Sequence, residues 1–259
     1  MTRCLVTGAG KRLGREMALY LARRGFDVAL HYAGSKDGAE TAAKEIRALG
    51  RKAEVLQADF LDEAQVQALF PRAVAAMDGP ITCLVNNASI FEYDTVATAT
   101  RTSWDRHLDS NLRAPFVLTQ AMGAQGLAPA RNAAGEPVAA GLIVNIIDQR
   151  VLKPTPEFMS YTIAKMALWA MTRTTAQALA PAIRVNAIGP GPTLRAERQS
   201  AEHFANQRAA TVLGRGGDPA DINAALGYFL DAPAVTGQLL CVDGGQHLGW
   251  RTPDVQGVE

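Results

Sequence analysis

The stretch CLVTGAGKRLGRE, residues 4–16, decides the fold. It begins with a short apolar run typical of a buried strand. Gly8, Gly10 and Gly14 follow where the chain turns into an amphipathic segment. A tight glycine turn between a first strand and a first helix lets the amides at the start of the helix receive a diphosphate. Alone, three glycines could form a purely structural turn, but the strand and helix units that follow favour nucleotide binding.

Outward from this turn, short runs rich in branched apolar residues alternate with longer amphipathic segments. This alternation predicts an α/β fold: one Rossmann-type domain over residues 1–259, with a doubly wound parallel sheet and helices on both faces. We expect strands near Cys4, Val28, Val55, Leu84, Val144, Val185 and Cys241. We expect helices at roughly 12–24, 38–49, 62–77, 101–125, 158–180 and 219–230.

Two stretches interrupt this alternation. The residues APARNAAGEP from Ala128 are predicted to form a surface loop that lengthens one connection. Residues 189–217 are rich in Gly, Pro and Arg. Long connections in compact domains are usually functional or disordered, so this second stretch is a candidate lid over a substrate site.

Composition argues against large charged partners. The 259 residues include 26 basic and 25 acidic side chains, a formal net charge of +1. No electrostatic footprint therefore points to nucleic acid or to an acidic membrane surface. We expect small-molecule partners and further copies of the chain. With no leader-like or membrane-spanning apolar stretch in the sequence, a cytoplasmic location is expected.

The cysteines and histidines do not indicate a metal site. Cys4, Cys83 and Cys241 lie far apart in apolar runs, which suits buried reduced thiols. His107, His203 and His247 have no metal-ligand spacing with one another or with cysteine, and are expected to be surface or packing residues. No bound metal is predicted.

The most specific chemical signal is SYTIAKMAL, in which Tyr161 and Lys165 are four residues apart, with Asp148 thirteen residues upstream of the tyrosine. On a helix, side chains at i and i+4 share one face, which brings the ammonium group beside the phenol. A nearby cation favours phenolate, so we expect a lowered Tyr161 pKa and an acid-base role. Asp148 could instead cap a turn after its strand.

Cofactor specificity should depend on the end of the second strand, where an acidic side chain would bind a ribose 2′-hydroxyl and repel a 2′-phosphate. Here the chain reads LHYAGSK, and Asp27 lies at the wrong end of the strand. Donors and positive charge are expected from Lys11, Arg12, His31, Ser35 and Lys36. This set favours NADPH over NADH, although any single lysine could be an ordinary solvated side chain.

The chain resembles the short-chain dehydrogenase/reductases over nearly its whole length. The resemblance is carried by TGAGKRLG, by Asp59 after the third strand and by NNAS from Asn86. Asn111, the Tyr161 and Lys165 pair, and GPGPT from Gly189 continue the pattern in order. The resemblance implies an NADP-dependent oxidoreductase that forms dimers or a homotetramer.

Within that family the chain is most similar to pteridine reductases and bacterial dihydromonapterin (dihydrofolate) reductases. Asp148 stands where most members have a serine, Arg12 replaces the middle glycine of the turn, and Phe91 occupies the place of a ring-stacking phenylalanine. Gly34 departs from this likeness, because an arginine is common there. A pterin-type substrate is therefore expected. Phe91 could equally be a loop anchor on the core.

The resemblance implies a role for each matched position. Tyr161 would donate the proton and Lys165 would hold the nicotinamide ribose, while Asn111 would anchor a water in a proton relay. Substrate would contact Arg12, Ser89, Phe91, Asp148 and Tyr161. The cofactor would contact Gly8, Gly10, Arg12, Leu13, Gly14, His31, Tyr32, Ser35, Asp59, Asn87, Ala88, Ser89, Tyr161, Lys165, Pro190 and Gly191.

Two alternatives stay open from the sequence. One is an ordinary carbonyl or alcohol oxidoreductase in which aspartate has replaced serine. The other is a non-catalytic NADP-binding sensor, against which the intact Tyr161, Lys165 and Asn111 argue.

Overall fold

Seven parallel strands form the central sheet of the computed structural model, which describes residues 2–196 and 199–250. The strands are β1 (Arg3–Val6), β2 (Asp27–Tyr32), β3 (Ala53–Gln57), β4 (Cys83–Asn86), β7 (Gly141–Ile146), β8 (Ile183–Pro190) and β9 (Leu239–Val242). Their order is β3-β2-β1-β4-β7-β8-β9, and all seven predicted strands are confirmed. The order reverses between β1 and β4, where open α/β sheets bind ligands.

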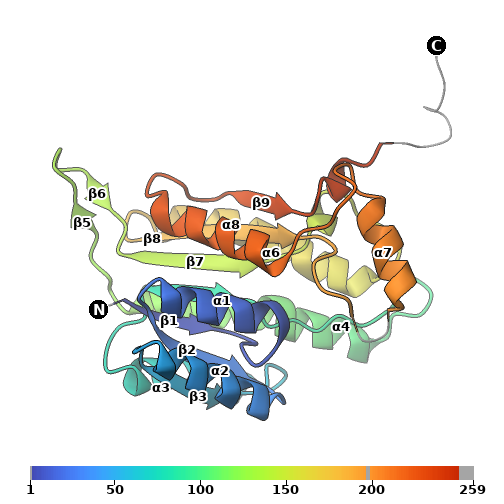
Figure 1. The fold of residues 1–259 in the computed structure, drawn as a ribbon. Helices are drawn as coiled ribbons and strands as arrows, with labels where there is room; N and C mark the ends of the chain where they lie inside the picture. Colours follow the sequence, from blue (N-terminus) through green and yellow to red (C-terminus); the bar gives the residue numbers. More distant parts are fainter. Residues whose placement is uncertain (1, 197–198, 251–259) are drawn as a thin grey trace.

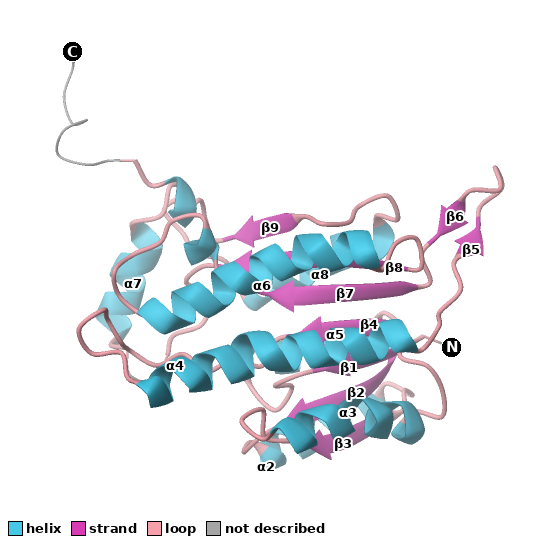
Figure 2. Cartoon of the chain, turned by 180° about the vertical axis from the view of Figure 1, so that it is seen from behind, coloured by secondary structure: helices cyan, strands magenta, loops and turns pink. Residues whose placement is uncertain are grey.

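Helices cover both faces of this sheet (Figures 1 and 2). One face carries α1 (Arg12–Arg23), α2 (Lys36–Ala48) and α8 (Pro219–Asp231). The other carries α3 (Glu63–Ala76), α4 (Arg101–Leu108), α5 (Ala114–Ala124) and α6 (Met159–Ala178). Each face has its own apolar core, with Met17 and Leu226 in one and Leu69 and Leu118 in the other. Strands buried on both faces explain the continuous apolar runs in the sequence.

The helix expected at 101–125 is interrupted. A π-helical turn, Asp109–Arg113, separates α4 from α5 and contains the buried Ser110 and Asn111. Single π-helical turns inside α-helices are frequent at functional sites. The hydrophobic period is barely altered by one such turn, so the sequence pattern did not reveal it.

The prediction of an irregular surface loop from Ala128 is wrong in part. The chain there forms a short antiparallel hairpin, β5 (Ala130–Arg131) with β6 (Pro137–Val138). The Asn132 side chain closes the turn by accepting from the amides of Ala134 and Glu136. The hairpin projects from the end of the molecule opposite to α7 (Ala201–Ala209) (Figure 1).

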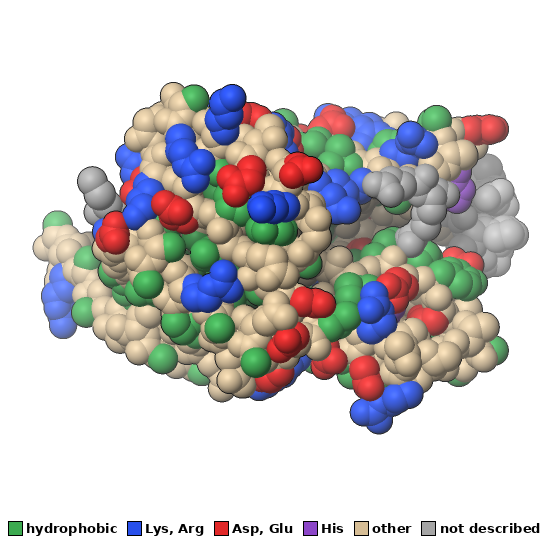
Figure 3. Space-filling view, turned by 90° about the horizontal axis from the view of Figure 1, so that it is seen from below, with side chains coloured by type: hydrophobic (Ala, Val, Ile, Leu, Met, Phe, Trp, Pro, Cys, Tyr) green, Lys and Arg blue, Asp and Glu red, His purple; other side chains and the backbone are tan. Residues whose placement is uncertain are grey.

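The strands point toward the end of the molecule that carries α7 (Figure 1). This helix lies within residues 189–217, the segment predicted to be a lid. Residues 197 and 198 of that segment lie outside the described residues. From below, basic and acidic side chains are interspersed over the surface, and the molecule is hollowed at this same end (Figure 3). The hollow is where the sheet topology places a ligand site.

Candidate active site

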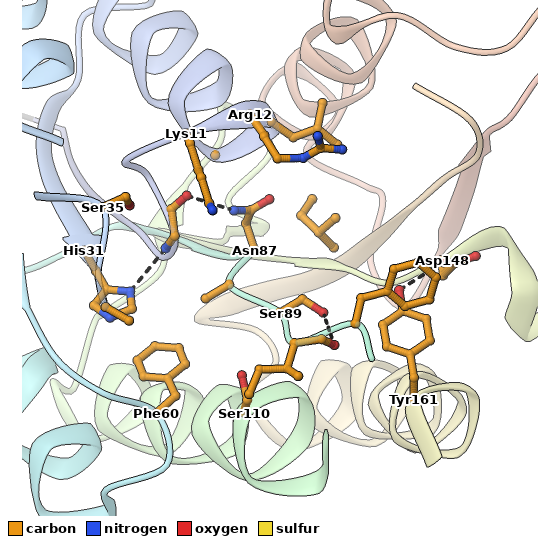
Figure 4. A pocket seen from close by; sticks show the side chains of 18 of the residues that line it. Lys11, Arg12, His31, Ser35, Phe60, Asn87, Ser89, Ser110, Asp148 and Tyr161 are labelled. Carbon is orange, nitrogen blue, oxygen red and sulfur yellow. Dashed lines mark hydrogen bonds between the residues drawn. The ribbon is translucent and has the colours of Figure 1, made fainter. Parts of the chain in front are cut away.

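A cleft of about 600 Å³ lies at the carboxyl ends of the strands (Figure 4). This is within the range of roughly 300–1,000 Å³ typical of small-molecule sites. Most of the predicted site residues line it, namely Gly8, Arg12, Leu13, Gly14, His31, Ser35, Asp59, Asn87, Ala88, Ser89, Phe91, Asp148, Tyr161, Lys165, Pro190 and Gly191. Within the described part of the chain, Gly10, Tyr32 and Asn111 are not among its lining residues.

The glycine turn is shaped by close backbone approaches. Gly8 has φ +65°, and a Cβ on Gly14 would lie 2.2 Å from the carbonyl oxygen of Gly8. A Cβ on Gly10 would lie 2.2 Å from Oγ of Ser35. Gly10 therefore lets the turn pack against the start of α2. Glycine is therefore needed at positions 10 and 14 for space, and at Gly8 for its left-handed conformation.

Arg12 occupies the turn with φ +54°, a conformation that costs a non-glycine residue free energy. Its guanidinium group donates to the carbonyl oxygens of Leu194 and Arg195, each at 2.8 Å. These bonds offset the backbone cost and join the glycine turn to the predicted lid segment. Arg12 lines the cleft as predicted, at its boundary with that segment.

The residues around this turn fit a dinucleotide. A diphosphate needs free amides and positive charge at a helix start. Lys11, the N-cap residue of α1, makes no side-chain capping bond in the described structure, and it lines the cleft beside Arg12 (Figure 4). Ala33, Gly34 and Ser35 form the wall at the end of β2 without a carboxylate. A Cβ on Gly34 would meet open space, so this wall leaves room for a 2′-phosphate.

The expectation that His31 supplies positive charge is wrong. Its Nδ1 accepts from the Gly8 amide at 3.2 Å, and its Nε2 lies 3.0 Å from the Ala58 carbonyl oxygen. The ring also stacks on Phe60 with a centroid distance of 4.3 Å. Burial, above all, lowers the pKa of His31 from 6.5 to about 4. The imidazole is therefore neutral at pH 7 and supports the glycine turn from beneath.

This His31 environment predicts acid-sensitive stability. The pKa of His31 is lower in the folded protein than in the unfolded chain. Its contribution to the free energy of unfolding is therefore complete above about pH 6.5 and is lost as the pH falls toward 4. At about 1.4 kcal/mol per pH unit, the full loss from this residue is roughly 3 kcal/mol. Urea denaturation near pH 7 and near pH 4.5 measures it.

The matched variant is His31→Asn, whose Oδ1 retains an acceptor for the Gly8 amide but does not titrate. Between pH 7 and pH 4.5, the free energy of unfolding of this variant should fall by about 2 kcal/mol less than that of the wild type, or by a larger difference. An equal pH dependence in the two proteins would contradict the assigned role.

Tyr161, Asp148 and Lys165 meet at the cleft as the sequence predicts. The Tyr161 hydroxyl donates to Oδ2 of Asp148 at 2.9 Å (Figure 4). Asp148 also caps the turn after β7 by accepting from the Arg150 amide at 2.8 Å. The predicted turn cap is therefore confirmed, and the acid-base role of Asp148 stays a prediction. Lys165 Nζ donates to the Ile146 carbonyl oxygen at 2.9 Å and lies 5.7 Å from the centre of the Tyr161 ring.

The direction expected for the Tyr161 pKa is wrong in this structure. Burial and the neighbouring Asp148 raise the pKa of the phenol well above 10. Burial also raises the pKa of Asp148, and it lowers the pKa of Lys165 to about 8. Burial has the largest effect on the phenol, and the carboxyl group in direct contact with the hydroxyl adds to it. Tyr161 is therefore protonated at neutral pH.

Asn111 lies on the π-helical turn and is fully buried. Its Oδ1 accepts from the Ile90 amide and its Nδ2 donates to the Ile90 carbonyl oxygen, both at 2.8 Å. The side chain therefore holds the segment that carries Ser89 and Phe91 at the cleft. Its part in a proton relay remains a prediction.

Phe91 belongs to an aromatic cluster that the sequence revealed only in part. Its ring stacks on Phe158 at 4.3 Å and contacts Tyr161 at a tilt, with centroids 4.5 Å apart. Tyr93 meets Phe158 edge-on, and the Arg150 guanidinium lies 5.3 Å from the same ring. Phe158, at φ +54° before α6, was not predicted. The only available signal was its nearness to Tyr161 in sequence.

No described helix combines the length and apolar character needed to span a membrane. Among the same residues, no three or more His, Cys, Asp or Glu side chains are grouped so as to hold a metal ion.

Comparisons with known proteins give the family. The family model described as enoyl-(acyl carrier protein) reductase matches residues 8–247. The 3-oxoacyl-(acyl-carrier-protein) reductase FabG of Staphylococcus aureus is 30% identical over 249 residues, which are 94% of this chain and 97% of that protein.

Solved structures agree. FolM alternative dihydrofolate reductase 1 from Brucella suis, in complex with NADP, is 44% identical, with 98% of each chain covered and a TM-score of 0.90. A short-chain dehydrogenase from Burkholderia cenocepacia in complex with NADP is 30% identical, with 95% of this chain and 97% of that chain covered and a TM-score of 0.83. Together with the glycine turn and the Tyr161 and Lys165 pair, these matches establish that the chain belongs to the short-chain dehydrogenase/reductase family.

Proposed function

We propose that this protein is an NADPH-dependent reductase that transfers hydride to a pterin-type ring, such as a dihydropteridine, dihydromonapterin or dihydrofolate. The observation that carries the proposal is the Asp148 carboxyl group, 2.9 Å from the Tyr161 hydroxyl. Phe91 lies beside this pair, with its ring centre 4.5 Å from that of Tyr161. The 44% identity to a protein called an alternative dihydrofolate reductase supports the same substrate class.

The cofactor is NADP(H). When bound, NADPH would supply the hydride for this reduction. The amides at the start of α1, with Lys11 and Arg12, would hold its phosphates. Lys165, with its pKa near 8, is still mainly protonated at pH 7 and would donate to the ribose hydroxyls.

Asp148 and Tyr161 would act as one proton-donating unit. Because burial raises the pKa of each, the pair retains a proton close to the substrate at neutral pH. A carboxyl group also suits a ring that presents N–H donors and basic ring nitrogens, since it can accept from the former and donate to the latter. An ionised carboxylate would repel the oxyanion that forms during reduction of a ketone. This difference favours a pterin over a simple carbonyl substrate.

A carbonyl oxidoreductase is the second candidate. It is supported by the 30% identity to a 3-oxoacyl-(acyl-carrier-protein) reductase over nearly the whole chain. In that case Asp148 would have to be protonated to assist Tyr161 at a carbonyl oxygen.

Substrate assays distinguish the two candidates. Oxidation of NADPH is followed with purified protein and dihydropteridines, dihydromonapterin or dihydrofolate, and in parallel with ketones and a 3-oxoacyl thioester. We expect kcat/KM for one of the reduced pterins to exceed every ketone value. A higher value for the ketones or the thioester would overturn the proposal. Tight NADPH binding without turnover of any compound would indicate a sensor.

A further inference from the structure

A buried polar network lies directly behind Tyr161, outside the residues that line the cleft. His107 and Ser160 have no exposed surface and Asp94 is 2% exposed. Asp94 follows the segment that carries Phe91, His107 lies on α4, and Ser160 is the residue before Tyr161 on α6. Three elements distant in sequence therefore meet at one point.

Asp94 caps the helix that carries Tyr161. The N-cap residue of α6, Phe158, has no side chain that can cap. The Asp94 carbonyl oxygen instead accepts from the Met159 amide at 3.2 Å, and its carboxylate accepts from the Ser160 amide at 3.1 Å. The Ser160 hydroxyl also donates to this carboxylate. Unpaired amides at a helix start need acceptors. A residue 66 positions earlier supplies them, which fixes the direction in which Tyr161 leaves the helix.

The hydrogen bonds determine the tautomer of His107. Its Nε2 lies 3.1 Å from the Glu92 amide, which can only donate, so Nε2 carries no proton. The proton is therefore on Nδ1, which donates to the Ser160 hydroxyl at 2.7 Å. That hydroxyl then donates to Asp94. Each group therefore donates a hydrogen bond to the next, from the Glu92 amide through His107 and Ser160 to Asp94.

Burial keeps the His107 ring neutral at pH 7. Burial lowers the pKa of His107, partly offset by Asp94 and Glu92. The Glu92 carboxylate is itself paired with Arg106 at 2.7 Å. The imidazole and the Tyr161 ring meet in an edge-to-face arrangement, with centroids 6.0 Å apart.

We propose that the network of His107, Ser160 and Asp94 is a positioning device that holds the proton donor and the aromatic wall of the substrate site in one fixed relation. One end of it anchors the Glu92 amide, next to Phe91. The other end anchors Ser160, next to Tyr161. This role rests on the proposed function of Tyr161 and Phe91, and none of the three residues is among those that line the described cleft.

Two substitutions of His107 separate the two ends. In His107→Asn, the side-chain amide can keep the donor to Ser160 but loses the acceptor for Glu92. In His107→Gln, the longer amide can keep the acceptor for Glu92 but loses the donor to Ser160. Each variant leaves one buried polar group without its partner, which we expect to change the affected kinetic constant about tenfold.

We therefore expect different kinetic changes in the two variants. His107→Asn should raise KM for the substrate about tenfold, because the Phe91 wall loosens, with kcat nearly unchanged. His107→Gln should lower kcat about tenfold with KM nearly unchanged, because Tyr161 is displaced.

In the wild type, KM should rise in acid as His107 takes a proton on Nε2, and the Gln variant should lack that rise. Identical changes in both variants, or none in either, would overturn the proposal.

Ser160→Ala provides a second measurement if the His107 variants do not fold. It removes the hydroxyl but keeps the amide that Asp94 caps, and should reproduce the lower kcat of the Gln variant. Unchanged kcat in Ser160→Ala would refute the relay. All ratios are taken with whichever substrate the wild type reduces, so a failure to reduce pterins counts against the proposed function and not against the network.

Discussion

Tyr161→Phe should lower kcat/KM for the reduced pterin about a thousandfold, within the 10²–10⁴ range typical of a lost general acid. The substitution removes only the hydroxyl that donates to Asp148, and leaves the buried ring against Phe91. Affinity for NADPH should stay within about threefold, because the amides and cations of the glycine turn are untouched. Steady-state kinetics and fluorescence titration with NADPH measure the two effects.

Thermal unfolding of Tyr161→Phe serves as the control for folding. Loss of turnover together with a lowered melting temperature would point to disrupted packing around a ring that is only 6% exposed. Turnover within about tenfold of the wild type would remove Tyr161 from the chemistry.

Asp148→Ser should lower kcat/KM for the reduced pterin about a hundredfold, while turnover of ketones stays constant or rises. The carboxyl group is lost as a partner for ring nitrogens and as part of the proton-donating unit. A neutral hydroxyl at the same place can donate to a carbonyl oxygen, which the carboxylate could not do without first taking a proton. Measuring both substrate classes on one variant therefore separates the two candidate functions.

Asp148→Asn is the matched control. Serine and asparagine can each cap the turn by accepting from the Arg150 amide, as Asp148 does at 2.8 Å. A loss of pterin turnover in both variants identifies the carboxyl group, and not the cap, as the cause. Full pterin turnover in Asp148→Ser would contradict the role of Asp148 and favour the carbonyl oxidoreductase.

Local signals predicted most of the fold. All seven strands of the sheet and six long helical segments were recognisable, because buried parallel strands and amphipathic helices differ in hydrophobic period. The hairpin of Ala130–Arg131 and Pro137–Val138 was missed, since strands of two residues have no period to detect. The π-helical turn at Asp109–Arg113 was missed because it displaces the helical pattern only slightly.

The candidate site was predicted unevenly for a similar reason. Residues that follow a strand or sit at fixed spacing, such as Gly8, Asp148 and Tyr161, reach the cleft as expected. Phe158 carries no sequence signal of its own, because its place against Phe91 depends on a left-handed conformation before α6. Gly10 was assigned to the cofactor, but it is not among the lining residues of the described cleft, and a Cβ there would meet Ser35.

The sequence by itself determined the order of strands and helices, the glycine turn, and the presence of a tyrosine, a lysine and a carboxyl group at one edge of the sheet. Only the tertiary structure decided the protonation states of the side chains at the site. It buried His31 as a neutral ring and set Asp148 against Tyr161, which reversed the expected pKa direction. Periodicity and turn chemistry depend on neighbours in the chain, but desolvation and long-range hydrogen bonds depend on what folding brings together, such as Asp94 and Ser160.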